Sequence, residues 1–169
     1  KLPVLECGES GSTLRFLIPV ALALQGGGVF RGRGRLMDRP QEPYFRIFDG
    51  MGITHRREGD SLTVRGRLRP GEDPMPGDVS SQFVTGLLFA LPLLEGESII
   101  RLTSPLESRG YVDMTLQVLR DRGIRVEELP EGFRVPGGQQ YGRGTLGEEA
   151  DYSQAAFWLS AAGLGSPLT

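Results

Sequence analysis

In the segment Pro76-Gly-Asp-Val-Ser-Ser-Gln-Phe-Val-Thr-Gly-Leu-Leu-Phe-Ala-Leu91, a turn signal, a polar cluster and an apolar helix follow one another. The large apolar residues fall at i, i+4, i+5 and i+8, which predicts a helix buried along one face: Phe83, Leu87, Leu88 and Leu91. Ser80, Ser81 and Gln82 therefore lie at its N-terminal end, where free backbone N–H groups and the helix dipole favour an anion. Hydroxyl groups beside such N–H groups are well suited to bind a phosphate.

The same polar cluster has a second interpretation. Asp78 or Ser80 is a good N-cap residue, and a capped, buried helix needs no ligand at all. The negative charge of Asp78 would also repel an anion unless its side chain points away. Both interpretations stay open at this point.

Length and composition describe a single domain. A chain of 169 residues is long enough to bury a core, and its net charge of −2 gives no global attraction for nucleic acid or an anionic membrane. The one cysteine, Cys7, permits no internal disulfide, and no apolar run reaches the length of a membrane span. The absence of a signal peptide leads us to expect a cytoplasmic protein. Because the chain also lacks an initiator Met, we expect it to be a piece of a longer protein.

The predicted elements alternate between strands and helices along the chain. Pro19 is expected to kink or interrupt the first helix, and Arg31, Arg33 and Arg35 are expected on one side of a strand. The expected strands are residues 3–7, 29–36, 53–55, 61–64, 98–103, 125–129 and 132–135, and the expected helices are residues 14–24, 40–49, 83–91, 111–122 and 151–162.

These elements repeat with a period of 71 or 72 residues. Ser10, Ser81 and Ser153 each open an apolar helix, Arg39 and Arg109 precede the second helices, and Gly52-Ile53 matches Gly123-Ile124. Each unit is strand, helix, strand, helix, strand, strand, so the fold class is α/β with duplicated βαβαββ units packed around shared helices. The predicted units are about 1–72 and 73–144, followed by the start of a third at 145–169.

Several residues that often carry chemistry are better explained without it. His55 has no His or Cys neighbours at metal-ligand spacing, and Cys7 has no identifiable base. Arg31-Gly-Arg-Gly-Arg35 is similar to an RNA-binding tract, but it is short and lies in an acidic protein, which favours a solvated strand face.

Hydroxyl-bearing helix starts and loop arginines recur at equivalent places in the repeat. Pseudo-symmetry would bring them to one end of the domain, which would suit a small ligand with several negative charges. The hydroxyl residues are Ser10, Ser80, Ser81, Ser108 and Ser153, and the arginines are Arg15, Arg39 and Arg109.

Five of these segments resemble successive signatures of the EPSP synthases, the 3-phosphoshikimate 1-carboxyvinyltransferases. They are Cys7–Arg15, Met37–Pro40, Gly77–Phe83, Ser108–Thr115 and Asp151–Ala156, of which Ser80-Ser-Gln-Phe83 and Ser108-Arg-Gly-Tyr-Val-Asp113 are the most specific. The resemblance covers essentially the whole chain. It implies an enolpyruvyl transferase-like lobe of pseudo-symmetric βαβαββ units, with helices packed inside and sheets outside.

The resemblance also implies roles for individual residues. Ser80, Ser81 and Ser108 would hold the phosphate of shikimate 3-phosphate, with Tyr111 against the ring. Gly11 and Arg39 would contact phosphoenolpyruvate, Gly11 by close backbone approach and Arg39 as a bidentate clamp. Gln82 would lie between the two substrates, and Arg15 would be scaffold rather than ligand.

The implied reaction adds the shikimate 5-hydroxyl to C2 of phosphoenolpyruvate with protonation at C3, and then eliminates phosphate. No catalytic acid or base, metal or cofactor is expected in this chain. A Lys-Ser motif and a second lobe with the acid–base carboxylates are expected elsewhere in the full enzyme, so we expect the isolated chain to be inactive. Departures from the family pattern are Glu9 for a common Asn, Gly110 for a common Pro, and Asp38 before Arg39.

The expected partners are the two small substrates, with no nucleic acid and no membrane, and the full-length enzyme is expected to be monomeric. One alternative is the sister family, UDP-N-acetylglucosamine enolpyruvyl transferase. The other is a non-catalytic anion-binding or RNA-binding module that uses Arg31 to Arg35.

Overall fold

The computed structural model describes residues 1–143 and contains two copies of one unit. The first comprises β1 (Val4–Gly8), α1 (Gly11–Gln25), β2 (Gly27–Gly32), the 3-10 helix η1 (Leu36–Asp38), α2 (Glu42–Met51), β3 (Thr54–Glu58) and β4 (Ser61–Arg65). The second comprises β5 (Glu72–Met75), α3 (Ser81–Ala90), the 3-10 helix η2 (Leu91–Leu93), β6 (Ser98–Leu102), α4 (Arg109–Asp121), β7 (Glu127–Leu129) and β8 (Gly132–Val135). The predicted βαβαββ repeat is therefore confirmed.

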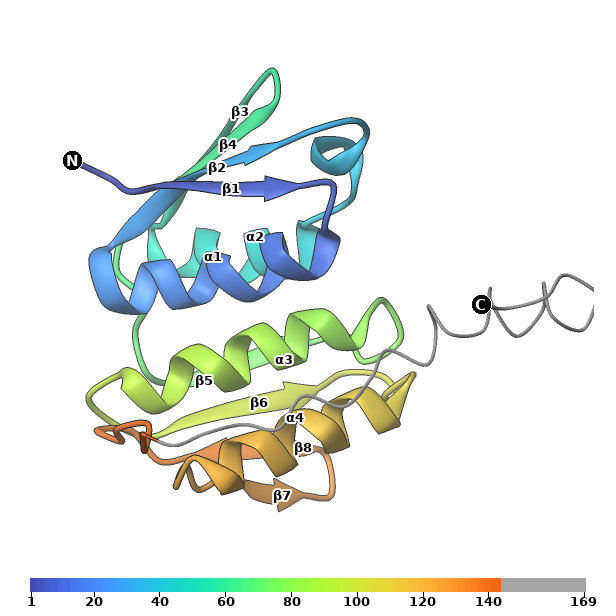
Figure 1. The fold of residues 1–169 in the computed structure, drawn as a ribbon. Coiled ribbons are helices and arrows are strands. Elements are labelled where there is room, and N and C mark those ends of the chain that lie inside the picture. The colour runs from blue at the N-terminus through green and yellow to red at the C-terminus, as the bar shows by residue number, and fades with distance from the viewer. Residues whose placement is uncertain (144–169) are drawn as a thin grey trace, which may run out of the picture.

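The strands of residues 1–143 form two four-stranded sheets of the same topology, in the orders β1-β2-β4-β3 and β5-β6-β8-β7. In each sheet the first two strands are parallel and the others are antiparallel, with Val4 paired to Val29 in one and Glu72 to Ile99 in the other. Figure 1 shows α1 and α3 side by side between the two sheets. The expectation of helices inside and sheets outside is confirmed.

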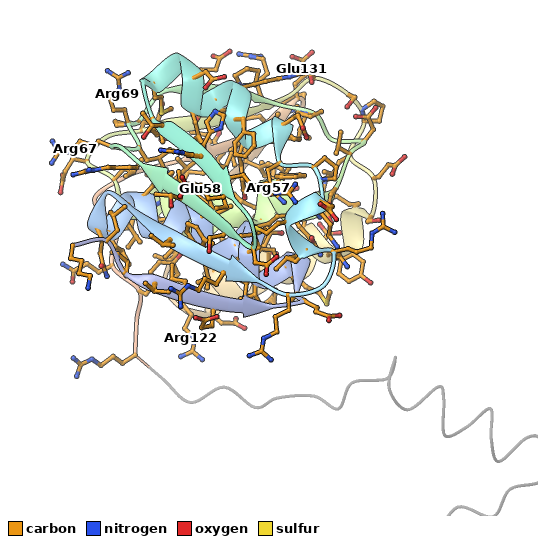
Figure 2. All side chains as sticks on the ribbon, turned by 90° about the horizontal axis from the view of Figure 1, so that it is seen from above. Arg57, Glu58, Arg67, Arg69, Arg122 and Glu131 are labelled. Atoms are coloured by element: carbon orange, nitrogen blue, oxygen red, sulfur yellow. The ribbon has the colours of Figure 1, made fainter. Side chains whose placement is uncertain are left out.

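One hydrophobic core runs through both units. Its largest fully buried side chains include Phe30, Tyr44 and Phe48 from the first unit and Phe83 and Phe133 from the second. The helix predicted from Phe83, Leu87, Leu88 and Leu91 is α3 with the start of η2, and all four side chains are buried. Charged side chains lie outside, as Arg67 and Arg69 do in the segment that joins the units (Figure 2).

Of the two effects expected of Pro19, a kink or an interruption, the interruption does not occur, because α1 continues through this residue. Proline has no N–H for the carbonyl oxygen of Arg15, its usual partner four residues earlier. The hydroxyl group of Tyr44 donates to that oxygen at 2.8 Å instead. Gly86 of α3 makes room for this contact, because a Cβ atom there would lie 2.5 Å from the same carbonyl oxygen.

Two further expectations need correction. The strand predicted at residues 29–36 ends at Gly32, because Gly34 has a positive φ of 57° and turns the chain into η1; Arg33 and Arg35 therefore lie in a turn. The sequence analysis also gave no strand for β5, whose Pro74 fits only because β5 is an edge strand. The helix expected at 151–162, with Ser153, and the third unit lie outside the described residues.

Candidate active site at the helix starts

The N-terminal ends of α1, α3 and α4 lie at the same end of the molecule, on the right in Figure 1. Ser10 caps α1 by accepting from the backbone N–H of Thr13 at 3.2 Å, and Ser80 caps α3 by accepting from that of Gln82 at 3.3 Å. The interpretation of Ser80 as an N-cap residue is therefore confirmed. The hydroxyl of Ser81 makes no cap, so it remains available to a ligand.

A cleft of about 640 Å³ opens between the starts of α3 and α4. It contains all five residues predicted for shikimate 3-phosphate: Ser80, Ser81, Gln82, Ser108 and Tyr111. Apolar side chains complete its walls, among them Phe16 of α1, Phe89 of α3 and Met114 of α4. Ser81 is only 6% exposed whereas Tyr111 is 63% exposed, so the cleft has a fixed polar floor and an open aromatic rim.

Gly77 holds the two loops of the cleft together. A Cβ atom at this position would lie 2.6 Å from the carbonyl oxygen of Ser104, so only glycine allows the loops to approach so closely. Its N–H donates to Ser104 Oγ at 2.9 Å, and its carbonyl accepts from the N–H of Glu107 at 2.9 Å. Ser104 in turn donates to Asp78 Oδ1 at 2.6 Å. The carboxylate of Asp78 is thus turned towards Ser104 and does not line the cleft.

Ser108 occupies a strained position at the start of α4. Its φ of 54° and ψ of 43° are left-handed, and it is the one non-glycine residue with a positive φ in the described part of the chain. Such a conformation is unfavourable for an L residue and is often found at functional sites. The Ser108 hydroxyl makes no capping hydrogen bond, which leaves it free at the cleft.

Gly11 and Arg39, the pair predicted for phosphoenolpyruvate, are in contact. A Cβ atom at Gly11 would lie 2.6 Å from Arg39 Nη1, so the absence of a side chain gives the guanidinium its place. Neither residue lines the 640 Å³ cleft; Arg39 borders a separate cavity of about 220 Å³. The preceding residue, Asp38, forms its ion pair with Arg57 at 2.6 Å, so the carboxylate of Asp38 does not neutralise Arg39.

Arg15 connects these two groups of residues. Its Nη1 donates to Gln82 Oε1 at 2.8 Å, and its Nη2 donates to the carbonyl oxygen of Pro40, next to Arg39, at 3.3 Å. Partial burial lowers the pKa of Arg15, and the positive charge of Arg39 lowers it further, although Tyr44 opposes this shift. Within residues 1–143, neither Arg15 nor Arg39 forms a salt bridge, so their charge is available to an anion.

Arg109 does not join them, contrary to the expectation from the repeat. Its guanidinium is neutralised by Asp113 at 2.7 Å and by Glu128. Glu9 does not line the cleft either. Its side chain packs against Gly34, where an added Cβ atom would lie 3.0 Å from Glu9 Oε1.

Four further polar residues of the cleft were not predicted from the sequence: Ser12, Thr85, Glu107 and Thr115. Thr115 donates to the carbonyl of Tyr111 at 3.0 Å and therefore accepts from Thr85 at 3.0 Å, which ties α4 to α3 beneath the cleft. Each threonine lies one helical turn after a predicted site residue, so its place in the cleft could have been predicted from the spacing. In the described part of the chain, Glu107 is the one charged residue that lines the cleft.

Cys7 and His55, the other residues that often carry chemistry, have structural surroundings and lie outside the cleft. Burial raises the pKa of the Cys7 thiol, with the charge of Glu6 adding to the shift, so the thiol stays protonated. His55 stacks on Phe45 at 3.9 Å and pairs with Asp49 at 2.9 Å. Among residues 1–143 no group of three His, Cys, Asp or Glu side chains has the arrangement of a metal site. In the same residues, no helix has the length and apolarity needed to cross a bilayer.

Comparison with known proteins shows the family to which the chain is related. The family model of EPSP synthase (3-phosphoshikimate 1-carboxyvinyltransferase) matches residues 2–166. The 3-phosphoshikimate 1-carboxyvinyltransferase of Clostridium acetobutylicum is 48% identical over 161 residues, covering 93% of this chain and 38% of that protein. That of Clostridioides difficile is 44% identical over 168 residues, covering 98% and 38%. EPSP synthase from Acinetobacter baumannii has a TM-score of 0.70 at 25% identity, covering 95% of this chain and 36% of that one. The chain thus spans about 38% of the length of these two curated relatives.

Proposed function

The chain belongs to the EPSP synthase family, and from this premise we propose that it is part of an enzyme that makes 5-enolpyruvylshikimate 3-phosphate. The enzyme transfers the enolpyruvyl group of phosphoenolpyruvate to the 5-hydroxyl of shikimate 3-phosphate, in the shikimate pathway to chorismate and the aromatic amino acids. The observation that carries the proposal is the cleft of hydroxyl groups at the start of α3, linked through Arg15 to the Gly11–Arg39 pair. We further propose that the complete enzyme is cytoplasmic and monomeric.

Shikimate 3-phosphate binds in the 640 Å³ cleft, with its phosphate at Ser80, Ser81 and Ser108. Serine hydroxyls and the N-terminal N–H groups of α3 supply hydrogen-bond donors, and the dipole of α3 supplies positive potential. Among residues 1–143 the lining has no cationic side chain, so in this part of the chain hydrogen-bond donors rather than ion pairs hold the phosphate. The exposed ring of Tyr111 covers the carbocycle.

Phosphoenolpyruvate binds beside Gly11 and Arg39. A guanidinium group can hold a carboxylate or phosphate with two parallel hydrogen bonds, and Arg15 adds a second positive charge nearby. The bare backbone of Gly11 lets the ligand approach the start of α1 closely.

The two sites meet at Gln82, so the shikimate 5-hydroxyl faces C2 of phosphoenolpyruvate. The hydroxyl oxygen adds to C2 and gives up its proton while C3 gains a proton, and the tetrahedral intermediate then loses phosphate and a C3 proton to restore the double bond. The residues of this chain position both reactants and stabilise negative charge, which contribute large parts of such a barrier. Proton transfer requires further groups of the complete enzyme, so residues 1–169 alone bind substrate without turnover.

Calorimetric titration tests this proposal. Shikimate 3-phosphate should bind saturably to the 169-residue chain, shikimate should not, and Ser81→Ala should weaken binding at least about tenfold, the loss of roughly one charge-assisted hydrogen bond. The matched control replaces Arg31, Arg33 and Arg35 together by Ser and should leave the affinity unchanged. Binding that survives Ser81→Ala but disappears in the triple variant would transfer the anion site to the arginine turn.

A further inference from the structure

We propose that Arg15 is a positioning residue that fixes the side-chain amide of Gln82 with its NH2 group directed into the cleft. This inference rests on the proposed function, since it gives Gln82 the role of a hydrogen-bond donor to the bound substrates. Arg15 itself does not line the cleft, so towards shikimate 3-phosphate it acts through its neighbours.

The chemistry of the guanidinium group dictates which end of the amide it binds. Arginine has five N–H donors and no acceptor, so the atom of Gln82 that lies 2.8 Å from Arg15 Nη1 has to be the oxygen Oε1. The NH2 group at the other end of the amide is then the part of Gln82 left for the cleft that it lines. A free glutamine would present either end; this one presents a donor, which suits oxygen-rich anionic substrates.

Arg15 is held at both its side chain and its backbone. Its guanidinium lies 4.6 Å from the centre of the Phe83 ring, the residue after Gln82. Its carbonyl oxygen accepts from Tyr44, whose hydroxyl also lies 3.0 Å from the carbonyl of Phe83. Both ends of Arg15 are thus fixed to the first turn of α3, and a fixed donor can hold the amide in one orientation.

The second arm of the guanidinium reaches the backbone next to the other predicted site. Nη2 donates to the Pro40 carbonyl, and Arg39 precedes Pro40. One planar side chain therefore sets the spacing between the segment that carries Arg39 and the amide of Gln82. Lysine carries the same charge but lacks the planar fork that makes both contacts.

Fold stability alone does not explain this arrangement. Within residues 1–143 Arg15 has no carboxylate partner, and its buried Nε has no hydrogen-bond partner. Burying part of a cation with an unsatisfied N–H is unfavourable, so a role in the site accounts for it better than a contribution to the fold.

A double-mutant cycle on the 169-residue chain tests the inference. Affinity for shikimate 3-phosphate is measured for the wild type, Arg15→Met, Gln82→Met and the double variant. Each single change should weaken binding about tenfold, and the double variant should bind like Gln82→Met, because Arg15 acts through Gln82. A double variant weakened by the product of the single effects, about a hundredfold, would overturn the inference while leaving the proposed function intact.

Gln82→Glu separates positioning from folding. It keeps an acceptor for Arg15 but replaces the NH2 donor by a carboxylate oxygen, so the melting temperature should stay the same or rise while binding weakens more than tenfold. Arg46→Met, which removes an exposed arginine from α2, is the matched control and should change neither quantity. Unchanged binding in Gln82→Glu would overturn the donor role.

A third measurement needs no substrate. The side-chain amide of Gln82 should give two well-separated proton resonances in ¹H–¹⁵N spectra of the ligand-free chain, which move towards free-amide positions in Arg15→Met and are partly restored in Arg15→Lys. Unchanged resonances in a folded Arg15→Met variant would overturn the inference. If shikimate 3-phosphate fails to bind the wild type, the proposed function fails, and these resonances still decide whether Arg15 positions Gln82.

Discussion

The hydroxyl oxygen of Tyr44 lies 2.8 Å from the carbonyl oxygen of Arg15, the acceptor that Pro19 leaves without a helical donor. Tyr44 is completely buried, and burial raises its pKa well above the usual value, so the phenol stays protonated and remains a donor. Its hydroxyl also lies 3.0 Å from the carbonyl of Phe83, on α3. A single side chain of α2 therefore supplies the donor that α1 lacks at Pro19 and connects α1 to α3.

Tyr44→Phe should lower the free energy of unfolding by about 1–3 kcal/mol, because it leaves the part-buried carbonyl oxygen of Arg15 without a donor. Chemical denaturation measures this change. Tyr141→Phe is the matched control: Tyr141 donates to the carbonyl of Phe89 at 2.7 Å near the surface, where water can replace it. Its loss should amount to about 0.5 kcal/mol or less. Equal losses in the two variants would contradict the role given to Tyr44.

Gly86→Ala should destabilise the chain, because the added Cβ atom would overlap the Tyr44 hydroxyl and lie 2.5 Å from the Arg15 carbonyl oxygen. Overpacking at this helix contact should lower the unfolding free energy by about 1–3 kcal/mol. Gly50→Ala in α2, where nothing lies within 4 Å of the new atom, should instead stabilise the chain by about 0.5 kcal/mol. A stabilising Gly86→Ala would refute the close contact.

Asp73 should make stability depend on pH. Its side chain is 3% exposed, its Oδ2 has no hydrogen-bond partner among the described residues, and burial raises its pKa to about 6. Below about pH 3 the carboxyl is almost entirely protonated in both the folded and the unfolded chain, and it imposes no penalty. As the pH rises, the unfolded chain ionises first, so stability falls until the folded-state pKa has been passed.

The loss attributable to Asp73 between pH 4 and pH 8 is about 2 kcal/mol, most of the roughly 3 kcal/mol that corresponds to the full pKa shift. Asp73→Asn removes this ionisation. Between the same two pH values, the free energy of unfolding of the variant should therefore rise by this amount relative to that of the wild type. Denaturation curves at the two pH values give the comparison. A difference between the two proteins that stays constant with pH would show that Asp73 ionises normally.

Glu107 is the charged residue of the cleft lining and should weaken the binding of a phosphate ligand. Glu107→Gln should raise the affinity for shikimate 3-phosphate about twofold to fivefold at low ionic strength, and the gain should shrink as salt screens the charge. Asp121→Asn makes the same charge change at the end of α4 and should have no effect. Weaker binding in Glu107→Gln would instead make Glu107 a ligand for a substrate hydroxyl.

The sequence predicts those features that depend on neighbouring residues. The apolar spacing of α3, the hydroxyl groups at its start and the glycine stop after α4 are local signals, and all three are found in the structure. The repeat in the sequence predicted the order of the βαβαββ units, and the resemblance to a family added the arrangement of helices inside and sheets outside. The five residues expected at shikimate 3-phosphate then line one cleft.

The errors concern residues whose partners are distant in sequence. The expected interruption at Pro19 ignored Tyr44, which supplies the missing donor from α2. Arg109 was grouped with Arg15 and Arg39 by the repeat, but Glu128 of β7 is near it and neutralises it. The contact between Arg15 and Gln82 joins residues 67 positions apart, so nothing in either segment alone predicts it.

Amide chemical shifts during titration with shikimate 3-phosphate test the central claim most directly, because they report which residues meet the phosphate. The largest shifts should fall on the backbone amides of Ser80, Ser81, Gln82 and Ser108, and shikimate without its phosphate should not produce them. Shifts concentrated on Arg31 to Arg35, or equal responses to both compounds, would contradict a phosphate site at the starts of α3 and α4.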